Sequence, residues 1–252
     1  MQHHSGNYDY ILAKITSLGL PPNPRILDFG CGTGAVVALG LARGLDICGA
    51  DTFADIYENW RDGVPEAARG AVHKIEAGRL PFPDASFDAV VSNQVFEHIR
   101  DPAPALAEVA RVLRRGGKFL AMFPVAETWY EGHAKLYFAH WLAGAPALQS
   151  AYVTAALKLG LGNRDSGVGT ESAAQSLLRV LRENCFNHRR RDIYRTFANA
   201  FGAPPKSISG DLIRARLAQR GGALSLLPDA LDPLLAFVSR ARLGEALLVK
   251  KL

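Results

Sequence analysis

The segment ILDFGCGTGAV, at residues 26–36, places three glycines within five positions directly after a short apolar run. Such a run predicts a buried strand, and the glycines predict a turn that leads into a helix. Because glycine has no Cβ, backbone N–H groups and the helix N-terminus can come close to a ligand there. The segment therefore restricts the chain to folds in which a strand, a glycine-rich turn and a helix follow one another.

The glycine spacing alone leaves the ligand open. Gly30, Gly32 and Ala35 satisfy the dinucleotide-binding pattern G-x-G-x-x-G/A loosely. A P-loop is excluded, because the sequence contains no G-K-[ST] after these glycines. The turn is thus compatible with a dinucleotide or with another molecule that carries adenosine.

Residues 25–124 alternate short apolar runs with helical patterns, which indicates repeated strand and helix units and a mostly parallel, Rossmann-like sheet. The best-defined helix follows Asp101, which can cap it, and its apolar residues recur at helical spacing. We expect this helix to stop at Gly116 and Gly117. Strands are predicted at 25–29, 46–50, 73–76, 88–92 and 118–123.

After Pro124 the sequence becomes aromatic and helical, which predicts an insertion over residues 126–188 that caps the sheet. It includes a glycine-bearing stretch at 159–170. The sheet is expected to resume with a helix at 192–201 and strands at 206–209 and 245–251. The predicted division is an N-terminal helix and the core at 1–125, a helical insertion at 126–188 and the rest of the core at 189–252.

Composition indicates a cytoplasmic globular protein. Hydrophobic residues make up 48% of the chain and charged residues 21%, and no apolar run approaches the ~20 residues that span a bilayer. The N-terminus lacks the order of a signal peptide. Cys31, Cys48 and Cys185 form no paired motif, so we expect reduced cysteines and no metal.

The net charge of +5 has a local source between residues 179 and 195. This basic stretch could meet phosphates or an anionic membrane surface, or it could be a solvated helix face. Its members are Arg179, Arg182, His188, Arg189, Arg190, Arg191 and Arg195.

Three acids occupy the ends of successive predicted strands: Asp28, Asp51 and Glu76. Asp28 lies two residues before Gly30, where a carboxylate could meet a cation but would repel a pyrophosphate. Asp51 lies about 20 residues past the loop, the position from which a carboxylate accepts ribose hydroxyls. Together the acids favour an adenosine that carries positive charge over one that carries phosphates. The alternative is that Asp51 and Glu76 are ordinary turn residues.

Four blocks in order, ILDFGCGTG, GADTF, EAGRLPFPDASFDAVVSNQVFEHI and LRRGGKFLAMFP, closely resemble class I S-adenosylmethionine-dependent methyltransferases of the type 11-like kind. The resemblance covers about residues 25–124, with a weaker echo in EALLVKK near the C-terminus. It implies an α/β fold with a doubly wound, mostly parallel seven-stranded sheet whose last strand is antiparallel. It also implies S-adenosylmethionine as the cofactor.

The resemblance implies a role for each matching residue. Asp28 and the glycine turn would hold the methionine portion of the cofactor, Asp51 the ribose, and Glu76 the adenine amine. The family often has D-A-E-x-L-P-F where this chain has Glu76-Ala77-Gly78-Arg79. The implied cofactor contacts are Asp28, Gly30, Cys31, Gly32, Gly34, Asp51, Thr52, Phe53, Glu76, Ala77, Gly78, Asn93 and Gln94.

Methyl transfer from a sulfonium needs an aligned acceptor, and a hydroxyl acceptor also benefits from a base. His98 and His133 are the candidates for proton transfer. For His98, which follows Glu97 in FEHI, the alternative is a histidine that hydrogen-bonds neighbouring loops.

The insertion offers Tyr130, Glu131, His140 and Trp141 as candidate substrate contacts, since aromatic rings beside polar groups suit a sugar or another ring. Alternatively, the aromatic residues pack the insertion onto the sheet. The stretch P-x-x-E-x-x-Y-E-G-H followed by F-A-H-W-L also resembles, more weakly, methyltransferases that accompany glycan and exopolysaccharide assembly.

The sequence thus predicts methyl transfer to an oxygen of a sugar, a glycan precursor or another small molecule. Two alternatives stay open: a lipid-linked or quinone-like acceptor at a membrane surface, and a noncatalytic cofactor-binding regulator or partner protein. No nucleic-acid partner is expected, because Ser-Asn-Gln-Val lacks the proline and aromatic pair usual in base-amine methyltransferases.

Overall fold

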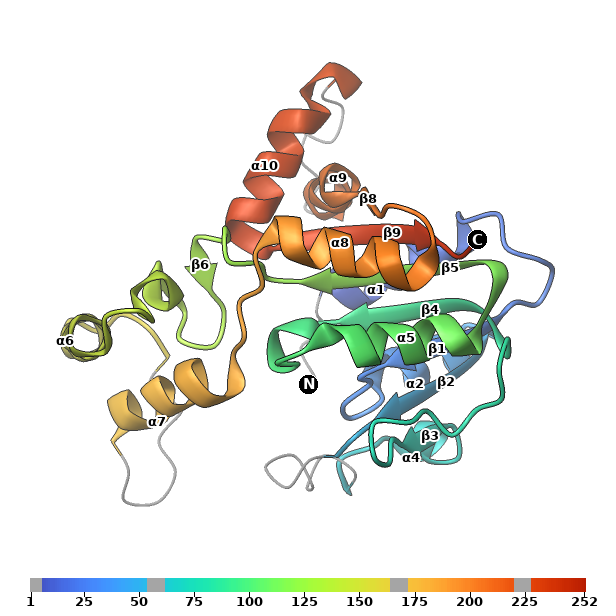
Figure 1. Ribbon diagram of the computed structural model, residues 1–252, viewed down its shortest axis with the longest axis horizontal. Helices are drawn as coiled ribbons and strands as arrows, with labels where there is room; N and C mark the ends of the chain where they lie inside the picture. The colour runs from blue at the N-terminus through green and yellow to red at the C-terminus, as the bar shows by residue number, and fades with distance from the viewer. Residues whose placement is uncertain (1–5, 54–61, 164–171, 220–227) are drawn as a thin grey trace.

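The centre of the molecule is a β-sheet with the strand order β3-β2-β1-β4-β5-β9-β8 (Figure 1). The computed structural model describes residues 6–53, 62–163, 172–219 and 228–252, and the sheet has seven strands within them. The strands are β1 (Arg25–Phe29), β2 (Asp46–Asp51), β3 (Val72–Lys74), β4 (Phe87–Asn93), β5 (Leu113–Phe123), β8 (Lys206–Ser207) and β9 (Glu245–Lys250).

The strand pairing confirms the predicted fold class. The strands from β3 to β5 pair in parallel, and β9 runs antiparallel to both β5 and β8. Because the carboxyl ends of the parallel strands meet at one edge, residues that follow β1, β2 and β4 gather there. That edge is where the glycine turn lies.

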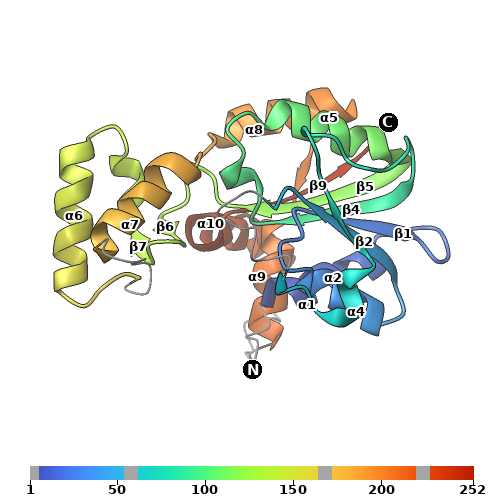
Figure 2. The same cartoon turned by 90° about the horizontal axis from the view of Figure 1, so that it is seen from below.

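Helices cover both faces of the sheet (Figure 2). On one face, α5 and α8 bury Leu106 and Phe197 in a phenylalanine-rich cluster with Phe96 and Phe119. On the other, α1, α2 and α9 bury residues such as Ile11 against the sheet. The helices are α1 (Gly6–Thr16), α2 (Ala35–Ala42), α4 (Glu66–Arg69), α5 (Pro102–Val112), α8 (Arg190–Phe201), α9 (Ser209–Gln219) and α10 (Asp232–Leu243).

Helix α5 begins as predicted and ends earlier than predicted. The Asp101 side chain accepts a hydrogen bond of 3.1 Å from the N–H of Ala103. The helix ends at Val112, not at the two glycines, because the fully buried Leu113 already pairs with Phe87 of β4. Gly116 and Gly117 instead lie within β5, where the register against β4 shifts.

Three predicted strands are shorter than expected, β9 by the single residue 251. β3 ends at Lys74 rather than at Glu76, because the chain turns there, and β8 ends at Ser207. The prediction for α8 is confirmed, since it ends at Gly202 in the left-handed conformation with φ 71°.

The insertion has a core of its own. It contains the hairpin of β6 (Tyr130–Glu131) and β7 (Leu136–Tyr137), then α6 (Pro146–Lys158), α7 (Ala173–Arg179) and a π-helical turn at Val180–Asn184. Buried residues such as Leu136, Val153 and Leu177 form a cluster separate from the sheet's. The predicted glycine-bearing stretch lies partly outside the described residues. The division at 126 and 188 stays a prediction.

The insertion extends beyond the ends of β4 and β5 rather than lying over a face of the sheet (Figure 1). It follows directly from the carboxyl end of β5. No helix within the described ranges is long and apolar enough to cross a membrane.

Candidate functional site

The turn after β1 depends on glycine. Gly30, Gly32 and Gly34 have positive φ angles of 74°, 51° and 72°, which side chains disfavour. A Cβ on Gly30 would also overlap the side chain of Val95. The turn is fixed by a hydrogen bond of 2.8 Å from the N–H of Gly30 to the carbonyl of Ala50. Helix α2 starts directly after it, so its free N–H groups face the same space.

A cavity of about 430 Å³ opens beside this turn. It brings together the end of β1, the glycine turn, the end of β4 and the first turn of α1. Its lining residues are Asn7, Tyr8, Asp28, Gly30, Cys31, Gly32, Thr33, Ala35, Val36, Asn93 and Gln94.

Sequence reasoning missed the contribution of α1. The amide of Asn7 donates a hydrogen bond of 2.8 Å to the side-chain oxygen of Asn93, so α1 closes one side of the cavity. Nothing in the sequence of α1 marks Asn7 or Tyr8. Their place follows from the topology, which brings the start of α1 to the end of β4.

Asp28 is a buried carboxylate without a partner. It is 3% exposed and lines the cavity, and among the residues that the structure describes its carboxylate makes no hydrogen bond or ion pair. Burial, and then the nearby charge of Asp51, raises the pKa of its carboxyl to about 7. Because an ionised carboxylate is costly there, the cavity favours a ligand that brings a positive charge.

Asp51 is held against the glycine turn. Its carboxylate accepts hydrogen bonds from the N–H of Gly32 at 2.8 Å and from the N–H of Phe53 at 3.1 Å. Thr52 beside it is exposed, and Phe53 is buried with a φ of 46°. The structure thus brings Asp28 and Asp51 together as the sequence predicted, and it fixes the orientation of Asp51.

Glu76 lies at the surface, in the turn after β3. It is exposed, follows the end of β3 by two residues and forms a backbone bridge with Arg79. The turn at Ala77 and Gly78, with φ angles of 50° and 72°, reverses the chain. Glu76 and Arg79 border a different cavity, of about 650 Å³, which is lined by His73, Lys74, Glu76, Arg79, Leu80, Pro81, Phe82 and Pro83.

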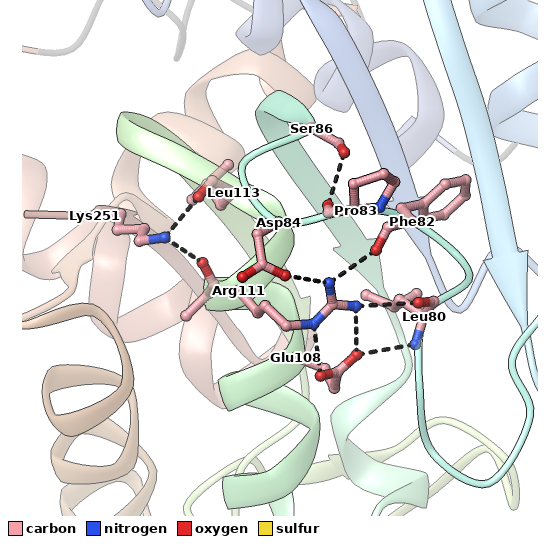
Figure 3. Close-up of polar contacts among 10 residues, drawn as sticks. Leu80, Phe82, Pro83, Asp84, Ser86, Glu108, Arg111, Leu113 and Lys251 are labelled. Atoms are coloured by element: carbon pink, nitrogen blue, oxygen red, sulfur yellow. Dashed lines mark hydrogen bonds and ion pairs between the residues drawn. The ribbon is translucent and has the colours of Figure 1, made fainter.

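The segment LPFPD, residues 80–84, is anchored by Arg111 of α5 (Figure 3). The guanidinium donates to the carbonyls of Leu80 and Phe82 at 3.1 and 2.8 Å and to the carboxylate of Asp84 at 2.8 Å. The guanidinium also donates to Oε2 of Glu108 at 2.8 Å, and the same oxygen accepts a hydrogen bond from the N–H of Leu80 at 3.0 Å. Part of the motif therefore serves to hold the loop, a role that the sequence alone did not reveal.

Beyond the cavity, the chain after β4 meets the segment that leaves the insertion. The short helix η2 (Phe96–His98) lies against residues 184–188. The N–H of Phe186 donates to the carbonyl of Glu97 at 2.6 Å, and Nδ1 of His98 donates to the carbonyl of Asn184 at 2.6 Å. Nε2 of His188 donates to the carbonyl of Ile99 at 2.9 Å.

Four of the titratable side chains at this junction form a group, here called the junction cluster: His98, Glu131, His133 and Cys185. Nδ1 of His133 lies 2.8 Å from Oε1 of Glu131 and 3.6 Å from Sγ of Cys185. The rings of His98 and His133 meet edge to face, with centroids 5.0 Å apart. The two predicted proton-transfer residues are therefore neighbours, and Cys185 is a member that the sequence did not indicate.

Protonation differs between the two histidines. Burial lowers the pKa of His98, which favours its neutral form. Burial also opposes charge on His133, but its hydrogen bonds to Cys185 and Glu131 raise its pKa to about 11. Burial alone would raise the pKa of the Glu131 carboxyl, but the hydrogen bond from His133 and its charge outweigh burial, so the pKa of Glu131 is lowered.

Glu97 lies beside this cluster. It is 1% exposed, and no other described residue donates a hydrogen bond to either of its side-chain oxygens. Burial raises the pKa of its carboxyl to about 8, with a smaller lowering by His133.

The predicted substrate contacts of the insertion separate into buried and exposed groups. Glu131 and His140 are 6% and 8% exposed, and burial lowers the pKa of His140. Trp141 is 52% exposed, and its indole N–H donates to the carbonyls of Ala126 and Thr128 at 2.9 and 3.1 Å. Tyr130 lies under the guanidinium of Arg242, which is 3.5 Å from the ring centroid.

The alternative in which the aromatic residues pack onto the sheet is wrong for the exposed ones. Trp129 and Phe138 are 39% and 40% exposed, and Trp129 contacts Phe237 of α10 with ring centroids 5.8 Å apart. An aromatic surface therefore runs from the hairpin to α10, with the members Trp129, Tyr137, Phe138, Trp141 and Phe237.

The basic stretch does not act as one surface. Arg190 pairs with the buried Glu245 at 2.8 Å, and Arg182 binds Gln149 at 3.0 Å. Arg191 and Arg195 have side chains that are 80% and 65% exposed. Only part of the stretch is therefore open to solvent.

Residues 27–121 match the family model described as a methyltransferase domain. An uncharacterized methyltransferase of Mycobacterium tuberculosis is 40% identical over 96 residues, which are 37% of each chain. The demethylmenaquinone methyltransferase of Deinococcus radiodurans is 35% identical over 133 residues, which are 50% of this chain and 54% of the relative. The chain spans about a third to a half of the length of such curated relatives.

A solved S-adenosylmethionine-dependent methyltransferase from Mesorhizobium loti superposes with a TM-score of 0.55. The alignment covers 98% of both chains at 14% identity, so the likeness concerns the fold. A geranyl diphosphate methyltransferase solved with its substrate and sinefungin gives a TM-score of 0.51 at 16% identity, covering 98% of this chain and 78% of that one.

Proposed function

We propose that this chain, whose residues 27–121 are a class I S-adenosylmethionine-dependent methyltransferase domain, transfers the cofactor's methyl group to an oxygen of a small molecule. A sugar or a glycan precursor is the favoured acceptor class. The cysteines are all free, which suits the reducing cytoplasm in which we expect the protein to act.

The observation that carries the proposal is Asp28. A buried carboxylate without a partner inside a glycine-walled cavity suits a ligand that presents an ammonium group and brings no phosphate. The methionine portion of S-adenosylmethionine has such a group. In this arrangement Asp28 holds the ammonium, and the glycine turn and the N-terminus of α2 receive the carboxylate.

Asp51 is suited to the ribose. Its carboxylate has a fixed orientation, and a carboxylate oxygen can accept a second hydrogen bond beside the one from Gly32. Asn93 ends β4 and Gln94 follows it, and both line the cavity that contains Asp28, so they would lie beside the reacting end of the cofactor. Glu76 is exposed, so its contact with the adenine amine requires the adenine to lie at the rim.

The acceptor would lie between the cavity and the insertion. The chain's part in the displacement is to align the acceptor oxygen with the methyl carbon and to exclude water. The exposed rings of Tyr137, Phe138 and Trp141 can stack on a sugar face, and the nearby Arg242 can hold an anionic group. Proton transfer by His98 or His133 stays a prediction.

A quinone-like or lipid-linked acceptor is the second candidate. It is favoured by the demethylmenaquinone methyltransferase relative and by the apolar side of α10, where Leu234, Phe237 and Val238 are 57%, 49% and 43% exposed.

Methyl-label transfer separates these candidates. The protein is incubated with methyl-labelled S-adenosylmethionine and either a water-soluble or an organic extract of the source cell, and labelled products are identified by mass. Label in a water-soluble sugar supports the first acceptor, and label in an isoprenoid or quinone supports the second. Binding of S-adenosylhomocysteine without label transfer to either extract would instead support a regulator or partner protein.

A further inference from the structure

Three metal-ligating side chains from distant parts of the chain meet at the junction cluster. His98 comes from η2, His133 from the turn after β6, and Cys185 from the segment that leaves the insertion. One ligand atom from each lies within 4.8 Å of the other two. Neither sequence motif nor spacing indicated this set, because 52 residues separate Cys185 from His133 and more separate it from His98.

We propose that His98, His133 and Cys185 bind one divalent transition-metal ion of the Zn²⁺ class. Imidazole and thiolate are the ligands that such ions prefer over oxygen-seeking Mg²⁺ or Ca²⁺. Zinc ligands at about 2.0 and 2.3 Å in a tetrahedral arrangement lie about 3.5 Å apart. Nδ1 of His133 and Sγ of Cys185 are already separated by 3.6 Å.

The backbone around the site orients these ligands. The hydrogen bond from Nδ1 of His98 to the carbonyl of Asn184 leaves Nε2 as the free ligand atom. Metal-binding histidines commonly donate their other ring nitrogen to a backbone carbonyl in this way. Because Asn184 precedes Cys185, the same contact fixes the thiol beside the ring. Phe186 adds a second backbone link to η2.

The charges around the site suit a cation. Glu97 is buried beside His133, and no donor among the described residues satisfies its side-chain oxygens. Glu131 is buried too, and its Oε1 lies 2.8 Å from Nδ1 of His133, where a metal ion on Nδ1 would take the place of the proton that they share. A buried carboxylate without a partner is costly, and a divalent ion next to these acids would offset that cost.

A metal here would join the core to the insertion and leave a fourth coordination position open, the pattern typical of catalytic zinc. One of its ligands, His98, lies four residues past Gln94, a residue that lines the cofactor cavity. With both imidazoles bound to metal, neither histidine would act as a free base. The inference goes beyond methyl transfer and does not depend on it.

The test uses the full chain, freed of metal by dialysis against a chelator and titrated with Co²⁺ as a spectroscopic probe. We expect one Co²⁺ per chain, d–d bands of a tetrahedral site and a thiolate-to-cobalt charge-transfer band, all removed by Zn²⁺. Cys185→Ser should abolish the charge-transfer band and weaken Zn²⁺ binding at least ~10-fold. Cys48→Ser, a change in a cysteine outside the cluster, should retain both.

A second measurement avoids dependence on variants. In the wild-type chain, Zn²⁺ should slow alkylation of Cys185, read by peptide mass, while Cys48 is unaffected. Absence of stoichiometric Co²⁺ and Zn²⁺ binding at micromolar protein concentration would overturn the proposal. A charge-transfer band that persists in Cys185→Ser, or alkylation of Cys185 at an equal rate with and without Zn²⁺, would also overturn it.

Discussion

The cofactor cavity contains a buried carboxylate without a partner, Asp28, and a second one, Glu97, lies beside the junction cluster. The two places differ in how the chain builds them. Asp28 lies within one contiguous segment whose glycines shape the cavity wall. Glu97 lies beside side chains drawn from three separate segments. A site carried largely by one segment has a sequence signature in that segment, although its contribution from α1 was still missed. A site assembled entirely by tertiary contacts has no signature until the topology is known.

Removing the charge of Asp28 and removing the charge of Glu97 should change the binding of different ligands. The first site should respond through the binding of an organic cation, and the second through the binding of a metal ion. Variants of each acid, tested against both ligands, measure whether the sites are as independent as their construction indicates.

The largest expected effect is on the pH dependence of stability. Burial and then Asp51 raise the pKa of Asp28 to about 7, so the ionised form is penalised in the folded state. Stability from this group is fully present below its unfolded pKa near 3.8 and is lost as pH rises through about 7. The slope is at most about 1.4 kcal/mol per pH unit.

Asp28→Asn should remove this slope, measured by urea unfolding of the cofactor-free protein between pH 4 and pH 8. The other titratable groups that face Asp28 are Tyr8, Cys31, Cys48 and Asp51, and they are common to both proteins. Parallel stability curves for wild type and variant would contradict the assignment of an unpaired buried charge.

Asp51→Ala should weaken binding of S-adenosylhomocysteine by about 3 kcal/mol, or about 100-fold, because two hydrogen bonds to a charged group are lost. Isothermal titration calorimetry measures the effect. Glu76→Gln is the matched control, and its effect should be below ~10-fold because Glu76 is exposed, whereas Asp51 is held against Gly32 of the cavity wall. Equal losses of S-adenosylhomocysteine affinity in the two variants would contradict the assignment of Asp51 to the ribose.

Arg111→Ala tests whether LPFPD serves the fold rather than the ligand. We expect a loss of about 2 kcal/mol in the free energy of unfolding, because Glu108 and the loop carbonyls lose their shared donor. Arg114→Ala removes the ion pair to Asp88 from a side chain that is 48% exposed, and should cost about 0–1 kcal/mol. Urea unfolding of both variants checks whether Arg111→Ala lowers the free energy of unfolding more than Arg114→Ala does.

Glu97→Gln has a smaller expected effect than Arg111→Ala. It should weaken Zn²⁺ binding about 10-fold, the usual size for a group beside the metal ligands, and leave S-adenosylhomocysteine affinity unchanged. Competition with a chromogenic chelator measures the first, and calorimetry the second. A loss of S-adenosylhomocysteine binding in this variant would mean that the cofactor cavity and the metal site are not independent.

The same contrast explains what could be predicted from sequence. Periodicity and glycine placement predicted β1, α8 and the parallel core, because each depends on local pattern. The end of α5 was misplaced because burial and sheet pairing of Leu113 overrode the glycine signal.

Side-chain placement was harder to predict. Glu76 was expected to end a strand, but the strand stops at Lys74, and a turn at Ala77 and Gly78 leaves Glu76 at the surface. Asn7 and Cys185 could not be assigned, since only the topology brings them to Asn93 and His133.

The most direct test of the central claim is calorimetric titration of S-adenosylmethionine into the wild-type chain and into Asp28→Asn at pH 8, where the wild-type carboxylate is ionised. The account predicts binding by the wild type and affinity at least ~10-fold weaker in the variant, because a charge-assisted bond to the ammonium is lost. Equal affinities in the two proteins would contradict it.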